Sequence, residues 1–118
     1  MMSEEEIHKI CNELKIDNYT INPDGSIDVN GDVVILIFIN ELPIKFNKVS
    51  GNFYCSYNNL STLKNFPNEV DEETFLYGNP LKSLDGYNGD CDMLYCDNKD
   101  YLILKHKRSK KLKILDTI

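Results

Sequence analysis

The middle of this chain repeats itself at a fixed distance of 21 residues. Residues 49–63 match residues 70–84, and weaker matches lie before and after these two segments. Identical residues coincide at four positions of this pairing: Val49 and Val70, Asn58 and Asn79, Leu60 and Leu81, and Leu63 and Leu84. A unit of this length cannot bury its apolar side chains alone, so the chain can fold only by stacking consecutive units.

The period and the Asn-x-Leu-x-x-Leu core are typical of a leucine-rich repeat. They predict an α+β solenoid in which each unit adds a short strand, at 53–55 and 75–77, to one small parallel sheet. The four leucines are expected to share one core. Asn58 and Asn79 follow the strands, where a side-chain amide can satisfy the backbone of the bend. The alternative is that both asparagines face solvent in ordinary turns.

Residues 1–33 are predicted to cap the stack. Ser3 and Glu6 have the spacing of a capping box, and apolar residues follow at helical intervals, which indicates a helix over about 3–16. Two short alternating segments, 19–21 and 27–29, flank an Asn-Pro-Asp-Gly turn and indicate a β-hairpin. An Asn-Gly pair after the second segment strengthens that signal.

The whole chain, 1–118, is expected to form one domain, with repeats over 34–100 and a basic cap over 101–118. The apolar run at 33–39 is too short to span a bilayer, which takes about 20 residues, and is predicted to be a buried strand. The acidic beginning of the chain does not resemble a signal peptide, so a cytoplasmic protein without membrane contact is expected.

Charge is divided unevenly along the chain. Residues 1–100 hold seven basic and 18 acidic side chains, whereas residues 101–118 hold six basic and one acidic. The basic residues of the tail are Lys105, Lys107, Arg108, Lys110, Lys111 and Lys113. They indicate either a terminal strand or helix that closes the stack with its lysines in water, or a patch that contacts nucleic-acid phosphates. The acidic body favours a basic partner surface.

Catalytic signatures are missing from the sequence. It contains no P-loop, dinucleotide-binding glycine pattern, nucleophile elbow or His-Glu-x-x-His motif. The four cysteines lack the paired spacing of zinc ligands, and Cys55 is expected to be a small core residue. We therefore predict a protein that is not an enzyme and that binds no cofactor or metal.

The unit at 49–70 resembles a repeat of short leucine-rich-repeat proteins encoded by tailed bacteriophages. It reads Val-Ser-Gly-Asn-Phe-Tyr-Cys-Ser-Tyr-Asn-Asn-Leu-Ser-Thr-Leu-Lys-Asn-Phe-Pro-Asn-Glu-Val, close to V-G-G-x-F-x-C-S-x-N-x-L-T-S-L-x-G-x-P. The segment at 19–33 resembles the hairpin that precedes such repeats. Glu72 and Glu73 depart from the pattern at its usual glycines, and 99–101 lack the Asn-x-Leu core. The resemblance implies partner binding.

These observations predict a phage-encoded protein that binds and inhibits or modulates a host protein or protein complex. Anti-defence activity, such as inhibition of a CRISPR nuclease, is one form, because an acidic body could occupy a basic nucleic-acid channel. The candidate contact residues are Tyr54, Ser56, Tyr57, Tyr77 and Tyr95. Two alternatives stay open: a nucleic-acid or ribonucleoprotein binder acting through the tail, and a structural scaffold that pairs strand edges as a homodimer.

Overall fold

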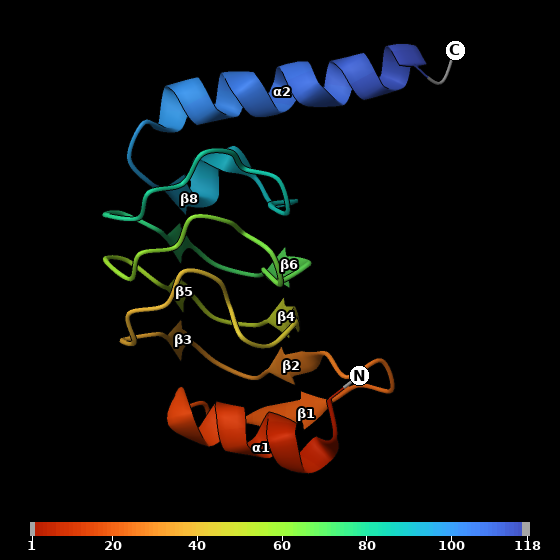
Figure 1. Cartoon of the computed structure of the whole chain (residues 1–118), viewed down its shortest axis with the longest axis vertical. Coiled ribbons are helices and arrows are strands. Elements are labelled where there is room, and N and C mark those ends of the chain that lie inside the picture. The colour runs from red at the N-terminus through yellow and green to blue at the C-terminus, as the bar shows by residue number, and fades with distance from the viewer. Residues whose placement is uncertain (1, 117–118) are drawn as a thin grey trace.

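The computed structural model describes residues 2–116, although within 111–116 it describes the helix and not the side chains. Over that range the chain forms two α-helices and two four-stranded, mostly parallel sheets (Figure 1). The elements are α1 (Glu4–Glu13), β1 (Tyr19–Ile21), β2 (Ile27–Val29), β3 (Val33–Val34), β4 (Phe46–Val49), β5 (Phe53–Tyr54), β6 (Glu69–Val70), β7 (Thr74–Phe75), the 3₁₀ helix η1 (Cys91–Met93), β8 (Leu94–Tyr95) and α2 (Lys99–Asp116).

Helix α1 begins as the capping box predicts. The Ser3 hydroxyl accepts from the Glu6 N–H at 3.2 Å and so satisfies one of the free donors of the first turn. Ile7 and Cys11 are buried against the body. The helix is shorter than the expected 3–16, because Lys15 takes a left-handed backbone conformation with φ of 58°. The chain then turns back to start the hairpin.

Strands β1 and β2 form the predicted antiparallel hairpin, with Tyr19 opposite Val29. The Asn-Gly pair at 30–31 does not form a second hairpin. Instead β2 pairs in parallel with β4, and the chain after Gly31 enters the other sheet. The first sheet has the order β1-β2-β4-β6, and the second has the order β3-β5-β7-β8. The expectation of a single small sheet was therefore wrong.

Neighbouring strands come from segments 20 or 21 residues apart. Val29, Val49 and Val70 lie side by side in the first sheet. In the second sheet the corresponding row is Val34, Tyr54, Phe75 and Tyr95. The residues that the sequence aligned are thus direct neighbours in space. Strand β7 begins at Thr74 rather than Phe75, because the small Thr74 side chain occupies the buried position beside Phe53.

Aromatic rings run through the core between the two sheets. Phe46 and Phe53 pack edge to face, with their ring centroids 5.4 Å apart, and Phe53 and Phe66 pack in the same way at 5.2 Å. Tyr87 continues the row at 5.6 Å from Phe66. Burying each such ring stabilises the fold by roughly 1.5–3 kcal/mol. Of the four matched leucines, Leu60, Leu63 and Leu84 are fully buried, and Leu81 is half-buried against the core.

The helices lie at opposite ends of the stacked strands: α1 packs beside β1 and β2, and α2 lies beyond β8 (Figure 1). Leu102 is buried where α2 meets the body. The helix starts at Lys99, two residues before the predicted cap. Along residues 2–116, neither helix has the length and apolar character needed to cross a membrane.

The prediction of a buried strand over 33–39 was wrong. Only Val33 and Val34 form a strand, and only Val33 and Ile35 are fully buried. Side chains of extended backbone alternate between two faces, and from Val33 to Leu36 one face is covered by the core while the other is not; beyond Leu36, Ile37 is exposed as well. Leu36 and Phe38 are consequently 83% and 76% exposed.

Candidate protein-binding face

The outer side of the second sheet carries a row of large side chains. Tyr54 stacks on Phe75 with ring centroids 5.1 Å apart and planes 6° apart, and Phe75 stacks on Tyr95 at 5.0 Å and 11°. Val34 precedes them in the same row. Residues that pair across neighbouring parallel strands point to the same face of the sheet. The paired side chains of this row therefore form a continuous strip. We call this row, with the exposed residues beside it, the aromatic face.

A second row adds to the aromatic face. It begins with Leu36 and continues through Ser56 and Tyr77. The backbone at Ser56 lies beside that at Tyr77, because the N–H of the next residue, Tyr57, donates to the Tyr77 carbonyl at 2.7 Å. Tyr77 is exposed and Ser56 is half-buried. The structure thus places Tyr54, Ser56 and Tyr77 on one face.

Tyr57 lies at the margin of this face. Its backbone is left-handed, with φ of 59°, and its side chain is 75% exposed. The ring lies against Gly78, since a Cβ added to that glycine would be 2.0 Å from a ring carbon. The absence of a side chain at Gly78 therefore lets the Tyr57 ring pack closely against the neighbouring turn.

The sequence interpretation missed the apolar residues at the start of the aromatic face. Val34, Leu36 and Phe38 are exposed, and Phe75 is half-buried in the middle of the stack. The apolar run at 33–39 could have revealed them if its alternation had been followed, because every second residue had to leave the core. These residues extend the candidate surface beyond the tyrosines.

Carboxylates border the aromatic face at the beginning of its strands. The Asp32 side chain accepts from the Asn52 N–H at 2.7 Å, and the Asn52 side chain accepts from the Glu73 N–H at 2.9 Å. Glu73 also lies beside the Tyr95 hydroxyl, where its hydrogen bonding and charge raise the pKa of Tyr95. At the far end, the Lys99 ammonium lies 5.3 Å from the centroid of the Tyr95 ring.

Asn58 and Asn79 are buried beneath the turns that follow the face. The Asn58 amide donates to the Ile35 carbonyl at 2.7 Å, and the Asn79 amide donates to the Cys55 carbonyl at 2.8 Å. The prediction that these amides satisfy the backbone is confirmed by those contacts. Cys55 is buried as expected, and burial raises the pKa of its thiol to about 11.

The basic residues of the tail lie on α2. Lys107, Arg108 and Lys110 are exposed, whereas the Lys105 ammonium donates to the Lys82 carbonyl at 2.7 Å. The side chains of Lys111 and Lys113 lie outside the described residues. Among the described residues, no group of three or more His, Cys, Asp or Glu side chains could hold a metal ion.

Comparison with protein-family models finds no match for this chain, and neither do comparisons with curated proteins and with solved structures. Its function is therefore inferred from the chemistry of its surfaces.

Proposed function

We propose that this protein is a non-catalytic binding module that holds a partner protein on its aromatic face. The observation that carries the proposal is the strip of stacked rings, exposed at Tyr54 and half-buried at Phe75 and Tyr95, together with the exposed side chains of Leu36 and Phe38. Exposure of an apolar patch to water is unfavourable in free energy, and such patches on folded proteins mark interaction surfaces. Tyrosine and phenylalanine at the centre of an interface supply much of its binding energy at little conformational cost.

The partner surface that fits this face is basic, with apolar side chains among its charges. Residues 1–100 carry a large excess of carboxylates, and Asp32 and Glu73 border the rings. Lys99 over Tyr95 illustrates the contact, because a cation is attracted to the face of an aromatic ring. The partner's Lys and Arg side chains would lie along the stack in the same manner.

A host protein with a basic nucleic-acid-binding surface is the partner that we propose. The resemblance to bacteriophage repeats favours a protein that inhibits or modulates such a target, anti-defence activity included. Occupying the basic surface with the acidic body would block its nucleic acid, and opposite charge would accelerate the encounter. The four cysteines are unpaired, which supports action in the reducing cytoplasm.

We further propose that the fold is a short leucine-rich-repeat solenoid. Three observations support this proposal. Partner strands come from segments 20 or 21 residues apart. The buried asparagines recur at the repeat distance. Left-handed backbone also recurs at matching turns, at Tyr57 and Gly78 and again at Asn65 and Gly86.

Affinity capture from bacterial lysates tests the binding proposal when wild type and two variants are compared. Leu36→Ser/Tyr77→Ser alters the aromatic face, and Tyr101→Ser/Leu104→Ser removes two exposed apolar side chains from α2 as a matched control. We expect wild type and the control to retain the same basic protein. The face variant should lose it, with Kd weakened by roughly 30-fold or more. Equal capture by all three proteins, or no specific capture, would refute the proposal.

A second candidate function is contact with nucleic-acid phosphates through α2. It is favoured by the exposure of Lys107, Arg108 and Lys110, none of which pairs with a carboxylate within the described part of the chain. Gel-shift titration at low and moderate salt distinguishes it from the first. A shift that weakens steeply with salt and disappears in Lys107→Glu/Arg108→Glu would support it. Absence of a shift at low salt would exclude it.

A further inference from the structure

Two Asn-Gly pairs occur in this chain, and an aspartate follows each of them. The first reads Val-Asn-Gly-Asp at 29–32, and the second reads Tyr-Asn-Gly-Asp at 87–90. In an Asn-Gly pair the backbone nitrogen of the glycine can attack the side-chain amide carbon of the asparagine, because glycine has no side chain to hinder the approach. Since the two local sequences are so alike, a difference in their reactivity must come from the fold.

The first pair is held where the chain passes from β2 to β3. The Gly31 N–H donates to the Ser50 hydroxyl at 2.8 Å, and that hydroxyl donates to the Asn30 side-chain oxygen at 3.3 Å. The Gly31 carbonyl accepts from the Gly51 N–H at 3.0 Å. The attacking nitrogen and the amide under attack are therefore both engaged, and local opening of the fold is needed to free them.

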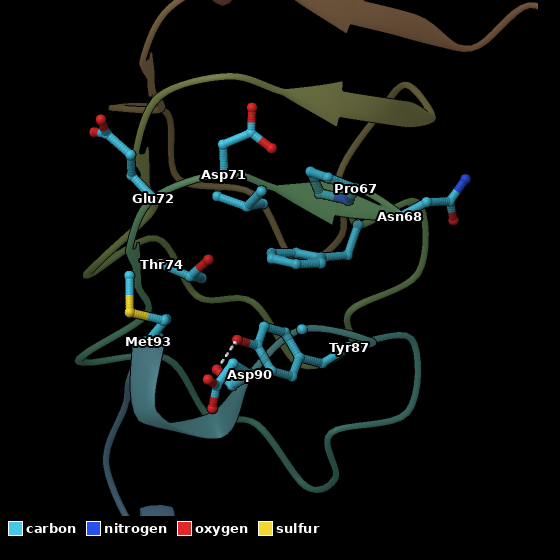
Figure 2. Close-up of a pocket in the computed structure, with 11 residues that line it drawn as sticks. Pro67, Asn68, Asp71, Glu72, Thr74, Tyr87, Asp90 and Met93 are labelled. Carbon is cyan, nitrogen blue, oxygen red and sulfur yellow. Dashed lines mark hydrogen bonds between the residues drawn. The ribbon is translucent and has the colours of Figure 1, made fainter.

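The second pair lies in the loop that leads into η1, beside a pocket of about 180 Å³ between β6 and η1 (Figure 2). At this place the chain forms η1 instead of a further strand of the first sheet. Asn88 and Gly89 are both exposed. Within the described part of the chain, neither the Asn88 side chain nor the Gly89 N–H has a hydrogen-bond partner. The groups that react are thus free at this pair.

We propose that Asn88 deamidates spontaneously in the folded protein and that Asn30 is protected from the same reaction. At the reactive pair, the Gly89 nitrogen loses its proton to solvent hydroxide and forms a bond to the Asn88 amide carbon. The side-chain carbon–nitrogen bond breaks, ammonia leaves, and a succinimide ring remains. Water then opens the ring to aspartate or isoaspartate, so the net change is hydrolysis of one amide. This site is separate from the aromatic face and does not depend on the function proposed for that face.

Isoaspartate inserts a methylene into the main chain beside a close contact. Gly89 lies against the Tyr87 ring, since a Cβ added to this glycine would be 2.8 Å from the hydroxyl oxygen. The same hydroxyl donates to the Asp90 carbonyl at 2.6 Å, as the dashed line in Figure 2 shows. A longer chain between Tyr87 and Asp90 disturbs this bond, and Tyr87 belongs to the aromatic row of the core. The isoaspartate product should therefore weaken the fold at this end of the stack.

Peptide mapping by mass spectrometry tests the proposal, because it resolves the mass gain at each asparagine. The full chain is incubated at mildly alkaline pH, once in native buffer and once in urea. In native buffer Asn88 should react about tenfold faster than Asn30, or more, because hydrogen bonds hold the first pair. In urea the two rates should converge, since the protection ends with the fold. Equal rates in native buffer, or an Asn88 that reacts only in urea, would overturn the proposal.

Ser50→Ala tests the source of the protection. It removes both side-chain hydrogen bonds of the first pair and should raise the Asn30 rate about tenfold, while the Asn88 rate stays the same. Ser61→Ala, at another exposed serine, is the control and should change neither rate. The Asn88 rate and the thermal melt of each variant report whether the fold is kept. An unchanged Asn30 rate in folded Ser50→Ala would overturn the role given to Ser50.

Thermal melts of aged samples test the structural consequence. Aged wild type should develop a lower-melting fraction that grows with its isoaspartate content. Asn88→Gln should not, because its longer side chain closes a ring much more slowly. Freshly prepared Asn88→Asp should melt like fresh wild type, since its carboxylate is exposed and its main chain is unchanged. Isoaspartate without a lower-melting fraction, or the same fraction in aged Asn88→Gln, would overturn this consequence.

Discussion

Asn79 is hydrogen-bonded to the backbone of Asn58, the residue that precedes it by one repeat. Its side-chain oxygen accepts from the Asn58 N–H at 3.1 Å and from the Leu60 N–H at 2.8 Å. Its amide donates to the Cys55 carbonyl at 2.8 Å and to the Leu76 carbonyl at 3.1 Å. One side chain thus joins two successive turns below the aromatic face.

Asn79→Ala is expected to destabilise the protein by roughly 1–3 kcal/mol, because it leaves buried backbone groups without partners. Chemical denaturation of wild type and variant measures the loss. Asn88→Ala is the matched control, since Asn88 is exposed and its side chain forms no hydrogen bond within the described residues. A silent Asn79→Ala would mean that water replaces the amide at little cost.

The matched leucines provide a second test. Leu63→Ala and Leu84→Ala should each cost roughly 2–5 kcal/mol, because both side chains are fully buried. Leu81→Ala should cost less, since Leu81 is only half-buried. Thermal melts can compare them with Lys64→Ala and Lys82→Ala, which alter exposed side chains and should be nearly silent. A damaging Lys82→Ala beside a silent Leu84→Ala would contradict the observed burial.

The local parts of this fold could be predicted from the sequence. The Ser3 cap and the hairpin depend on residues that are close along the chain, and both form as expected. The asparagines were recognisable because they recur in register with the leucines. The start of β7 was placed one residue late, at Phe75, although the 21-residue pairing already sets Thr74 opposite Phe53, where the core accepts the smaller side chain.

The second sheet and the candidate sites depend on contacts that the sequence does not display. The row of Tyr54, Phe75 and Tyr95 exists only because three strands pair in register. The run at 33–39 was mistaken for buried strand because composition alone does not separate a covered face from an open one. The pocket beside β6 forms where η1 replaces a strand, and no repeated residue marks that change.

Alternation along the run at 33–39 predicts opposite effects for neighbouring substitutions. Leu36→Ser and Phe38→Ser should change the free energy of unfolding by no more than about 0.5 kcal/mol, because both side chains already face water. Ile35→Ala should cost roughly 2–5 kcal/mol, because its side chain is buried. Urea unfolding of the three variants decides the matter. Equal losses would indicate that the whole run is covered.

The buried thiol of Cys55 predicts a loss of stability in alkali. Burial raises its pKa from 9.0 to about 11, so between these values the unfolded chain releases a proton that the folded chain keeps. The resulting stabilisation is fully present below pH 9 and is lost as pH rises toward 11, with a slope of about 1.4 kcal/mol per pH unit. Urea unfolding at pH 8 to 11 should show a shallower decline for Cys55→Ala than for wild type. Parallel curves, offset by a constant cost, would contradict the assignment.

The last prediction concerns His106, a half-buried residue of α2 whose two ring nitrogens are shielded from water. Neither ring nitrogen has a hydrogen-bond partner among the described residues, and the nearest carboxylate oxygen, on Asp85, is 3.9 Å from Nδ1. Buried nitrogens without partners cost free energy that an apolar side chain of similar size avoids. His106→Leu should therefore stabilise the protein by about 1 kcal/mol near neutral pH, measured by urea unfolding, whereas Asp85→Asn should have little effect. A destabilised His106→Leu together with a destabilised Asp85→Asn would show instead that the imidazole and the carboxylate form a stabilising ion pair.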